Sequence, residues 1–155
     1  KLLFYSFRST TDSSRRRFKG SMINGYNNNI NRTTIKEELD KRYIMTKLNA
    51  NDYYNEIGKY KFNISPEGNG IDCYRHYETW ISKGIPIIEY NSFIQKKYKN
   101  LPILWTKDYS EINDTYLNNM YEKFLDNDGD IFCIPSKYNN YMVDGFYSVK
   151  FIKNG

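Results

Sequence analysis

The stretch that decides the fold is residues 62–88, FNISPEGNGIDCYRHYETWISKGIPII, because two short apolar runs flank a glycine-bearing turn and an amphipathic segment. The apolar residues of that segment recur at helical spacing, and Gly84 has the position of a glycine that ends a helix at C′. The elements predicted from this stretch are a strand over 61–65, a turn over 66–70, a helix over 71–83 and a second strand over 85–88. This order is typical of strands that pair in parallel.

The flanking sequence continues the alternation of strands and helices. Apolar and aromatic runs over 2–7 and 101–105 indicate two further strands. Asp108 and Glu111 have the spacing of a capping box, which predicts a helix from residue 108 to about 126. The other predicted segments are a helix opening over 15–19, a mobile loop over 24–34, and helices over 35–42 and 50–59. The sequence therefore predicts an α/β fold, a Rossmann-like three-layer domain with a mainly parallel sheet.

Length, charge and composition narrow the class of protein. The 155 residues fit a single domain, 1–155, and the net charge of +5 suits an anionic partner such as a nucleic acid, a phosphate-bearing molecule or an anionic surface. No apolar run approaches the roughly 20 residues that span a bilayer, so no membrane span is expected. One histidine and two cysteines argue against a metal site of several histidines or of sulfur alone. The chain begins inside a strand-like run without a leader, which indicates a fragment of a longer protein and favours the cytoplasm.

The turn that precedes the central helix indicates a phosphate site. A loop that leads from a strand into a helix N-terminus brings free backbone N–H groups and the positive helix end to one place. Gly68 and Gly70 let the backbone approach a ligand closely. Asp72, Arg75 and Glu78 follow at helical spacing, and nucleotide sites commonly pair a cation with the diphosphate and a carboxylate with the ribose diol. The same pattern also fits a plain strand–turn–helix with a surface ion pair between Arg75 and Glu78.

The run SPEGNGIDCYRHYE at 65–78, followed by GIPII at 84–88, resembles the signature of exostosin-like glycosyltransferases. It looks most like the versions found in large DNA viruses and microbial eukaryotes. Weaker matches to the family pattern occur over 11–16, 101–104 and 108–112. The resemblance covers residues 1–125 and is most specific over 62–88.

The resemblance implies one lobe of a two-lobed GT-B enzyme, namely the C-terminal lobe that holds a nucleoside-diphosphate sugar. Such an enzyme transfers a hexose or pentose to a glycan or protein acceptor. The resemblance implies no metal and no other cofactor, because arginines and a helix N-terminus would stabilise the leaving diphosphate. The general base would come from a second lobe of the same protein, so no catalytic residue is assigned here. A viral version would act in the cytoplasm of the infected cell.

The same resemblance implies roles for individual residues. The donor-binding residues that it implies are Arg15, Arg16, Gly68, Asn69, Gly70, Asp72, Arg75 and Glu78. Glu78 would bind the ribose hydroxyls, while Arg75 and the 68–72 loop would face the diphosphate. Asp72 would orient Arg75 or touch the sugar. Arg15 or Arg16 would add a second cationic contact from the loop after the first strand.

Other interpretations of the sequence stay open. The lobe could hold a donor without activity of its own. The basic run over 15–19 also fits a nucleic-acid backbone, although no nucleic-acid motif accompanies it and the main interpretation expects no nucleic-acid partner. Two D-x-D spacings over 126–130 fit either a metal site or a solvated turn. His76 either contacts a ligand or is structural, and Cys73 and Cys133 are expected to be buried small hydrophobes or free thiols.

Overall fold

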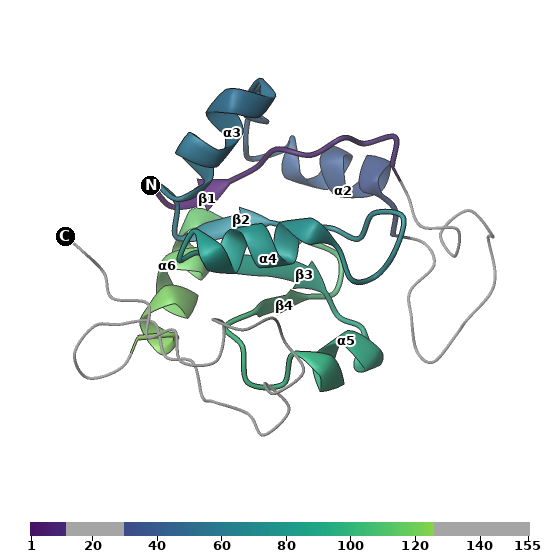
Figure 1. Cartoon of the computed structure of the whole chain (residues 1–155), viewed down its shortest axis with the longest axis vertical. Helices are drawn as coiled ribbons and strands as arrows, with labels where there is room; N and C mark the ends of the chain where they lie inside the picture. The colour runs from purple at the N-terminus through teal and green to yellow at the C-terminus, as the bar shows by residue number, and fades with distance from the viewer. Residues whose placement is uncertain (12–29, 126–155) are drawn as a thin grey trace.

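The apolar runs of the sequence come together as one parallel sheet in the computed structural model, which describes residues 1–11 and 30–125 (Figure 1). The strands are β1 (Leu3–Phe4), β2 (Phe62–Ile64), β3 (Ile85–Glu89) and β4 (Leu104–Thr106). They lie in the order β1-β2-β3-β4, and each neighbouring pair is parallel. Each connection between consecutive strands contains a helix, as parallel pairing requires. The predicted α/β class with a parallel sheet is confirmed.

Helices cover both faces of the sheet, which makes the domain three-layered (Figure 1). On one face, the ring of Phe62 in β2 contacts Tyr121 of α6 (Asp114–Lys123), with centroids 5.8 Å apart. The next residue, Asn63, points to the opposite face because side chains alternate along a strand. There its amide lies beside Gly84, which follows α4 (Tyr74–Ile81).

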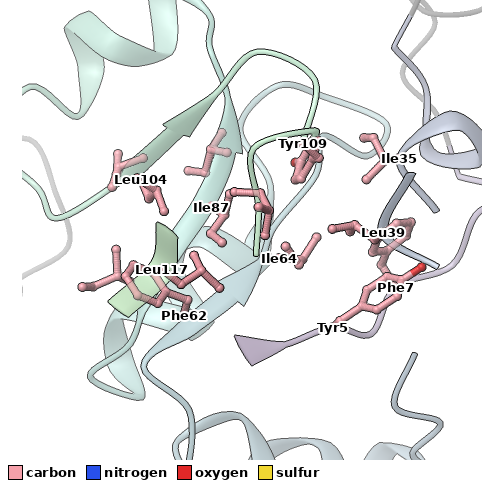
Figure 2. Close-up of a cluster of buried hydrophobic side chains, with 14 of the residues drawn as sticks. Tyr5, Phe7, Ile35, Leu39, Phe62, Ile64, Ile87, Leu104, Tyr109 and Leu117 are labelled. Atoms are coloured by element: carbon pink, nitrogen blue, oxygen red, sulfur yellow. The ribbon is translucent and has the colours of Figure 1, made fainter. Parts of the chain in front are cut away.

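The buried apolar cluster of the domain includes side chains of the sheet and of two helices on one of its faces, α2 (Arg32–Leu39) and α6. Figure 2 shows Ile35 and Leu39 of α2 among these side chains, near Ile64 and Tyr109. On the other face, Tyr53 of α3 (Ala50–Ile57) contacts Phe4, with ring centroids 5.7 Å apart. The same face carries α4 and α5 (Ser92–Lys97), and the buried rings that join these two helices are Trp80 and Tyr98, 5.0 Å apart.

The strands at the two edges differ from their predicted bounds. The predicted strand over 2–7 pairs as β1 only at residues 3 and 4. The pairing ends there because the carbonyl of Tyr5 accepts a hydrogen bond from Thr46 N, at 2.8 Å, and not from the neighbouring strand. The predicted strand over 101–105 becomes β4 at 104–106. Pro102 has no N–H to donate to a ladder, so pairing with β3 begins after it.

The helix that follows β4 begins later than predicted, and the proposed capping box is wrong. The carboxylate of Asp108 accepts from the residue two positions along, and Glu111 accepts from the Thr106 hydroxyl at 2.6 Å. Tyr109 has a positive φ of 65°, which interrupts a right-handed helix. Helix α6 starts only after Asn113, whose side chain caps it.

Two other helices were placed imperfectly from the sequence. Helix α2 covers 32–39 and not 35–42, because Asn31 and Thr34 form a reciprocal capping box inside the predicted loop over 24–34. The sequence predicts no helix over 92–97, where the structure has α5. Its signal is Asn91, whose side chain caps the helix by accepting from the N–H groups of Phe93 and Ile94. The predicted helix over 15–19, most of the 24–34 loop, the tail over 131–155, the aspartates over 126–130 and Cys133 lie outside the described residues.

The end of α4 also corrects the role predicted for Gly84. The left-handed residue is Lys83, with φ of 62°, so Lys83 stands at C′ and Gly84 at C″. The N–H of Lys83 bonds to Trp80 O and that of Gly84 to Thr79 O, both at 2.9 Å, which is the Schellman pattern. Gly84 is required for a different reason: a Cβ there would lie 2.7 Å from Asn63 Nδ2.

The close approach at Gly84 predicts a stability difference between two glycines. We expect Gly84→Ala to lower the free energy of unfolding by about 1–3 kcal/mol, because the new methyl group overpacks the contact with Asn63. Gly58→Ala is the matched control, since a Cβ there meets nothing nearer than 3.6 Å. Urea unfolding of both variants measures the difference, and equal stabilities would contradict the proposed role of Gly84.

Candidate functional site

The loop over 65–73 connects the carboxyl end of β2 to the N-terminus of α4. In open α/β sheets, ligands bind outside the carboxyl ends of the strands. An open pocket of about 340 Å³ lies at this edge. The residues that line it are Arg32, Gly68, Asn69, Gly70, Asp72, Cys73, Tyr74, Arg75 and Glu78.

The pocket brings together most of the residues implicated by the sequence. Six of the eight line it, namely Gly68, Asn69, Gly70, Asp72, Arg75 and Glu78. Arg15 and Arg16 lie outside the described residues. The helix behind the pocket is α4, and its N-cap Cys73 makes no side-chain capping bond. The N-terminus of α4 therefore borders the pocket without a capping bond from the N-cap side chain to its first N–H groups.

Glu78 is held by two tyrosines that the sequence analysis did not connect with it. The hydroxyl of Tyr53 donates to Oε2 at 2.8 Å, and that of Tyr54 donates to Oε1 at 3.1 Å. Both tyrosines belong to α3, which lies between β1 and β2 in the chain. Each carboxylate oxygen therefore has one bond that fixes its direction and keeps a lone pair for a further donor.

Arg75 and Glu78 do not form the surface ion pair that the sequence left open. Arg75 donates instead to the carbonyl of Ser6, just beyond β1, and its guanidinium lies 5.2 Å from the centroid of the Tyr53 ring. The aromatic ring and the carbonyl thus hold the cation at the wall of the pocket. The Arg75 and Glu78 side chains are joined through Tyr53, which contacts both.

Asp72 does not orient Arg75, and bonds to another helix. Its carboxylate accepts hydrogen bonds from the ammonium of Lys97 and from the hydroxyls of Tyr98 and Tyr77. Partial burial favours the neutral acid, but the bonds from Lys97 and Tyr98 outweigh it and hold the pKa of Asp72 below its ordinary value. Asp72 therefore fastens the start of α4 to α5 as a carboxylate.

Arg32 is the residue of this pocket that the sequence did not single out. It is 8% exposed, and its guanidinium donates to Glu67 O at 2.6 Å, to Arg8 O at 2.9 Å and to Pro66 O at 3.1 Å. A Cβ at Gly68 would lie 3.3 Å from Arg32 Nη2, so the absence of a side chain at Gly68 lets the loop lie against the guanidinium. No local pattern in the sequence predicts this contact, because its partners lie in two segments, at residue 8 and at residues 66–67, that are distant from Arg32 in the sequence.

His76 is buried beneath the loop, and both ring nitrogens are engaged. Its Nδ1 lies 2.6 Å from Ser65 Oγ and its Nε2 lies 3.1 Å from Ile71 O. Burial lowers the pKa of His76 to about 4, so the ring is neutral. Its Nε2–H donates a hydrogen bond to Ile71 O, and its Nδ1 accepts a hydrogen bond from the hydroxyl of Ser65. Of the two roles considered for His76, this geometry favours the structural one, since it joins the two ends of the loop.

Cys73 lies next to this histidine, with Sγ 3.5 Å from His76 Nδ1. Burial raises the pKa of the Cys73 thiol, which keeps it protonated and unreactive. Among residues 1–11 and 30–125, no three or more His, Cys, Asp or Glu side chains gather in a way that could hold a metal ion. Within the same ranges, no helix is long and apolar enough to cross a bilayer.

Comparison with known proteins does not assign this fold and pocket to a family. No family model matches the chain, and no curated protein matches its sequence. The chemistry of the pocket must therefore be judged from its own residues: backbone N–H groups, two arginines and two carboxylates, of which Glu78 is directed by tyrosines and Asp72 is bound to Lys97 and Tyr98.

The buried neutral histidine predicts a loss of stability in acid. The unfolded chain takes up a proton near the ordinary histidine pKa of about 6.5, whereas the folded chain resists it until about pH 4, so stability falls as the pH falls between these values. From pH 7 to pH 5 we expect His76 to account for a loss of about 2 kcal/mol in the free energy of unfolding.

Urea unfolding of the wild type and of His76→Gln at both pH values isolates this contribution, because the chain has no other histidine. The variant should be less stable at neutral pH but should lose less stability on acidification. Carboxylates titrate in both proteins and cancel in the comparison. An equal acid loss in the two proteins would show that the neutral buried ring does not control the effect.

Proposed function

We propose that this chain is the donor-binding lobe of a glycosyltransferase and holds a nucleoside-diphosphate sugar in the pocket above α4. The observation that carries the proposal is the convergence of six residues, implicated from the sequence alone, on one pocket at the carboxyl edge of the sheet. Those residues all lie within 68–78, so one loop and the helix that follows it build most of the pocket.

The diphosphate would lie against the N-terminus of α4 and the Gly68–Gly70 loop. Helix N-termini favour anions through their N–H groups and dipole. Arg75 and Arg32 line the same pocket and supply positive charge beside that position. Their own bonds to backbone carbonyls fix both guanidiniums in place, so little side-chain entropy remains to be lost when a phosphate binds.

The ribose would bind at Glu78. A carboxylate accepts hydrogen bonds from two adjacent hydroxyls more strongly than a neutral group does, because the charge assists both bonds. The hydroxyls of Tyr53 and Tyr54 hold the two oxygens of Glu78 in fixed directions. These tyrosines are therefore positioning residues in this proposal, while Glu78 makes the contact.

Glycosyl transfer requires the nucleoside diphosphate to leave while positive charge builds on the anomeric carbon. The helix end and the two arginines would stabilise the leaving diphosphate as its negative charge develops. We assign no general base to this chain, because in this proposal the base that activates the acceptor, a glycan or a protein, belongs to a second lobe. A donor-binding module without activity is the alternative, and a transfer assay with the isolated chain separates the two.

Binding of nucleoside diphosphates tests the proposal directly. Isothermal titration calorimetry with UDP, GDP and their sugars should detect at least one ligand. Glu78→Gln keeps the size of the side chain and should raise the dissociation constant of that ligand by roughly tenfold to hundredfold, because charge-assisted bonds to the ribose are lost. Glu37→Gln is the matched control, since Glu37 is exposed on α2 and does not line the pocket.

Two results would contradict the proposal. One is the absence of binding by every nucleoside diphosphate tested, with the chain shown to be folded by circular dichroism. The other is binding that Glu78→Gln and Glu37→Gln change equally. Tight binding of a polynucleotide with a steep salt dependence would favour the nucleic-acid alternative.

A further inference from the structure

A second open pocket lies at the same edge of the sheet, where β4 ends, and the proposed function does not use it. Its volume is about 410 Å³, somewhat larger than that of the pocket above α4. The residues that line it are Tyr90, Trp105, Thr106, Lys107, Asp108, Ser110 and Glu111. Tyr90 directly follows β3, and the others belong to the end of β4 and the turn beyond it.

Aromatic rings form one side of this second pocket. Tyr90 is 46% exposed and meets Trp105 edge to face, with ring centroids 6.2 Å apart and planes at 74°. The indole N–H of Trp105 makes no hydrogen bond to any described residue, whereas that of Trp80 donates to Pro102 O at 3.0 Å. The pocket thus offers aromatic surface together with a donor that has no partner in this part of the chain.

Two carboxylates also line this pocket, and each is held by one oxygen only. Asp108 Oδ1 accepts from the N–H and the hydroxyl of Ser110, at 3.1 and 2.6 Å. Glu111 Oε1 accepts from the hydroxyl of Thr106. Among the described residues, Asp108 Oδ2 and Glu111 Oε2 have no hydrogen-bond partner. The bonds from Ser110 lower the pKa of Asp108, so this group is an ionised acceptor.

The turn that carries these groups is fixed before any ligand arrives. Tyr109 has a positive φ, its side chain is buried, and its N–H donates to Thr106 Oγ1 at 2.9 Å. Arg42, which follows α2, donates to the carbonyls of Tyr109 and Ile112 at 3.1 and 2.8 Å. A strained residue held from both sides in this way is typical of preorganised ligand sites.

The charges of the second pocket distinguish its ligand from a phosphate. Two carboxylates, Asp108 and Glu111, face a single ammonium from Lys107, so the pocket disfavours an anion. Aromatic surface suits the apolar C–H face of a sugar ring, while carboxylate oxygens and an indole N–H suit its hydroxyls. We propose that the pocket formed by Tyr90, Trp105 and the 107–111 turn binds a neutral saccharide.

This proposal does not depend on nucleotide binding in the pocket above α4. If the proposed function holds, a neutral saccharide here is the acceptor glycan or the product, and both ligands lie along the same edge of the sheet. If it fails, the second pocket is a carbohydrate-binding site in its own right. The test must therefore follow the two pockets separately.

Nuclear magnetic resonance of the nitrogen-labelled chain follows the two pockets separately, because each contains its own N–H signals. The chain has two tryptophans, and Trp105→Phe identifies which indole N–H signal belongs to Trp105. The probes are methyl glycosides of glucose, galactose, mannose, xylose and N-acetylglucosamine, together with UDP and GDP. We expect at least one glycoside to shift the Trp105 signal saturably at millimolar concentration while the buried Trp80 signal stays in place. A nucleotide that binds above α4 would shift the Gly68 and Gly70 amides instead.

Tyr90→Ala should raise the dissociation constant of the glycoside by roughly threefold to tenfold, because one of the two aromatic rings is lost. Phe93→Ala is the matched control, since Phe93 is an aromatic residue of similar exposure, 51%, that does not line the pocket. The proposal is overturned if no glycoside shifts the Trp105 signal, if only a nucleotide shifts it, or if the two alanine variants weaken binding equally. None of these outcomes bears on calorimetry with Glu78→Gln.

Discussion

The architecture of the candidate site depends on one buried guanidinium. Arg32, the first residue of α2, donates to backbone carbonyls at residues 8, 66 and 67, and so joins the segment after β1 to the loop after β2. A buried cation is costly unless it is hydrogen bonded, and three carbonyls, at least one to each guanidinium nitrogen, offset that cost. His76 then holds the other side of the same loop through Ser65 and Ile71. Between these two anchors, the glycines at 68 and 70 face the pocket.

How much the sequence could predict follows from how local each interaction is. β2, α4 and β3 are predictable because the apolar runs and the helical periodicity that define them occur within one short stretch, residues 62–88. The start of α6 was misplaced because the capping pattern at Asp108 competes with a bond from Ser110 and with the positive φ of Tyr109. The residues that line the pocket above α4 were predictable because one loop and one helix supply most of them. Arg32 and the tyrosines of α3 were not, since only folding brings them there.

The two pockets share an edge of the sheet but differ in chemistry. The pocket above α4 has a helix N-terminus and two arginines, which suit phosphate groups, beside the carboxylates of Asp72 and Glu78. The pocket beyond β4 has two aromatic rings and two carboxylates with one lysine, which suits a neutral hydroxyl-rich ligand. A parallel sheet makes this arrangement possible because the carboxyl ends of β2 and β4 point the same way. The two pockets share no lining residue, so if both proposals hold, donor and acceptor bind at separate sites on one edge of the sheet.

The outer strands are too short to offer much of an edge for pairing with a strand of another molecule. Among residues 1–11 and 30–125, β1 and β4 stand at the two ends of the strand order and have only two and three residues. Short edge strands give an incoming strand few backbone groups to pair with, which protects against aggregation through sheet extension. If the proposed two-lobed enzyme is correct, its second lobe would dock on helix surfaces or on the carboxyl edge of the sheet, and not by adding a strand. Docking on the carboxyl edge would enclose a ligand bound there.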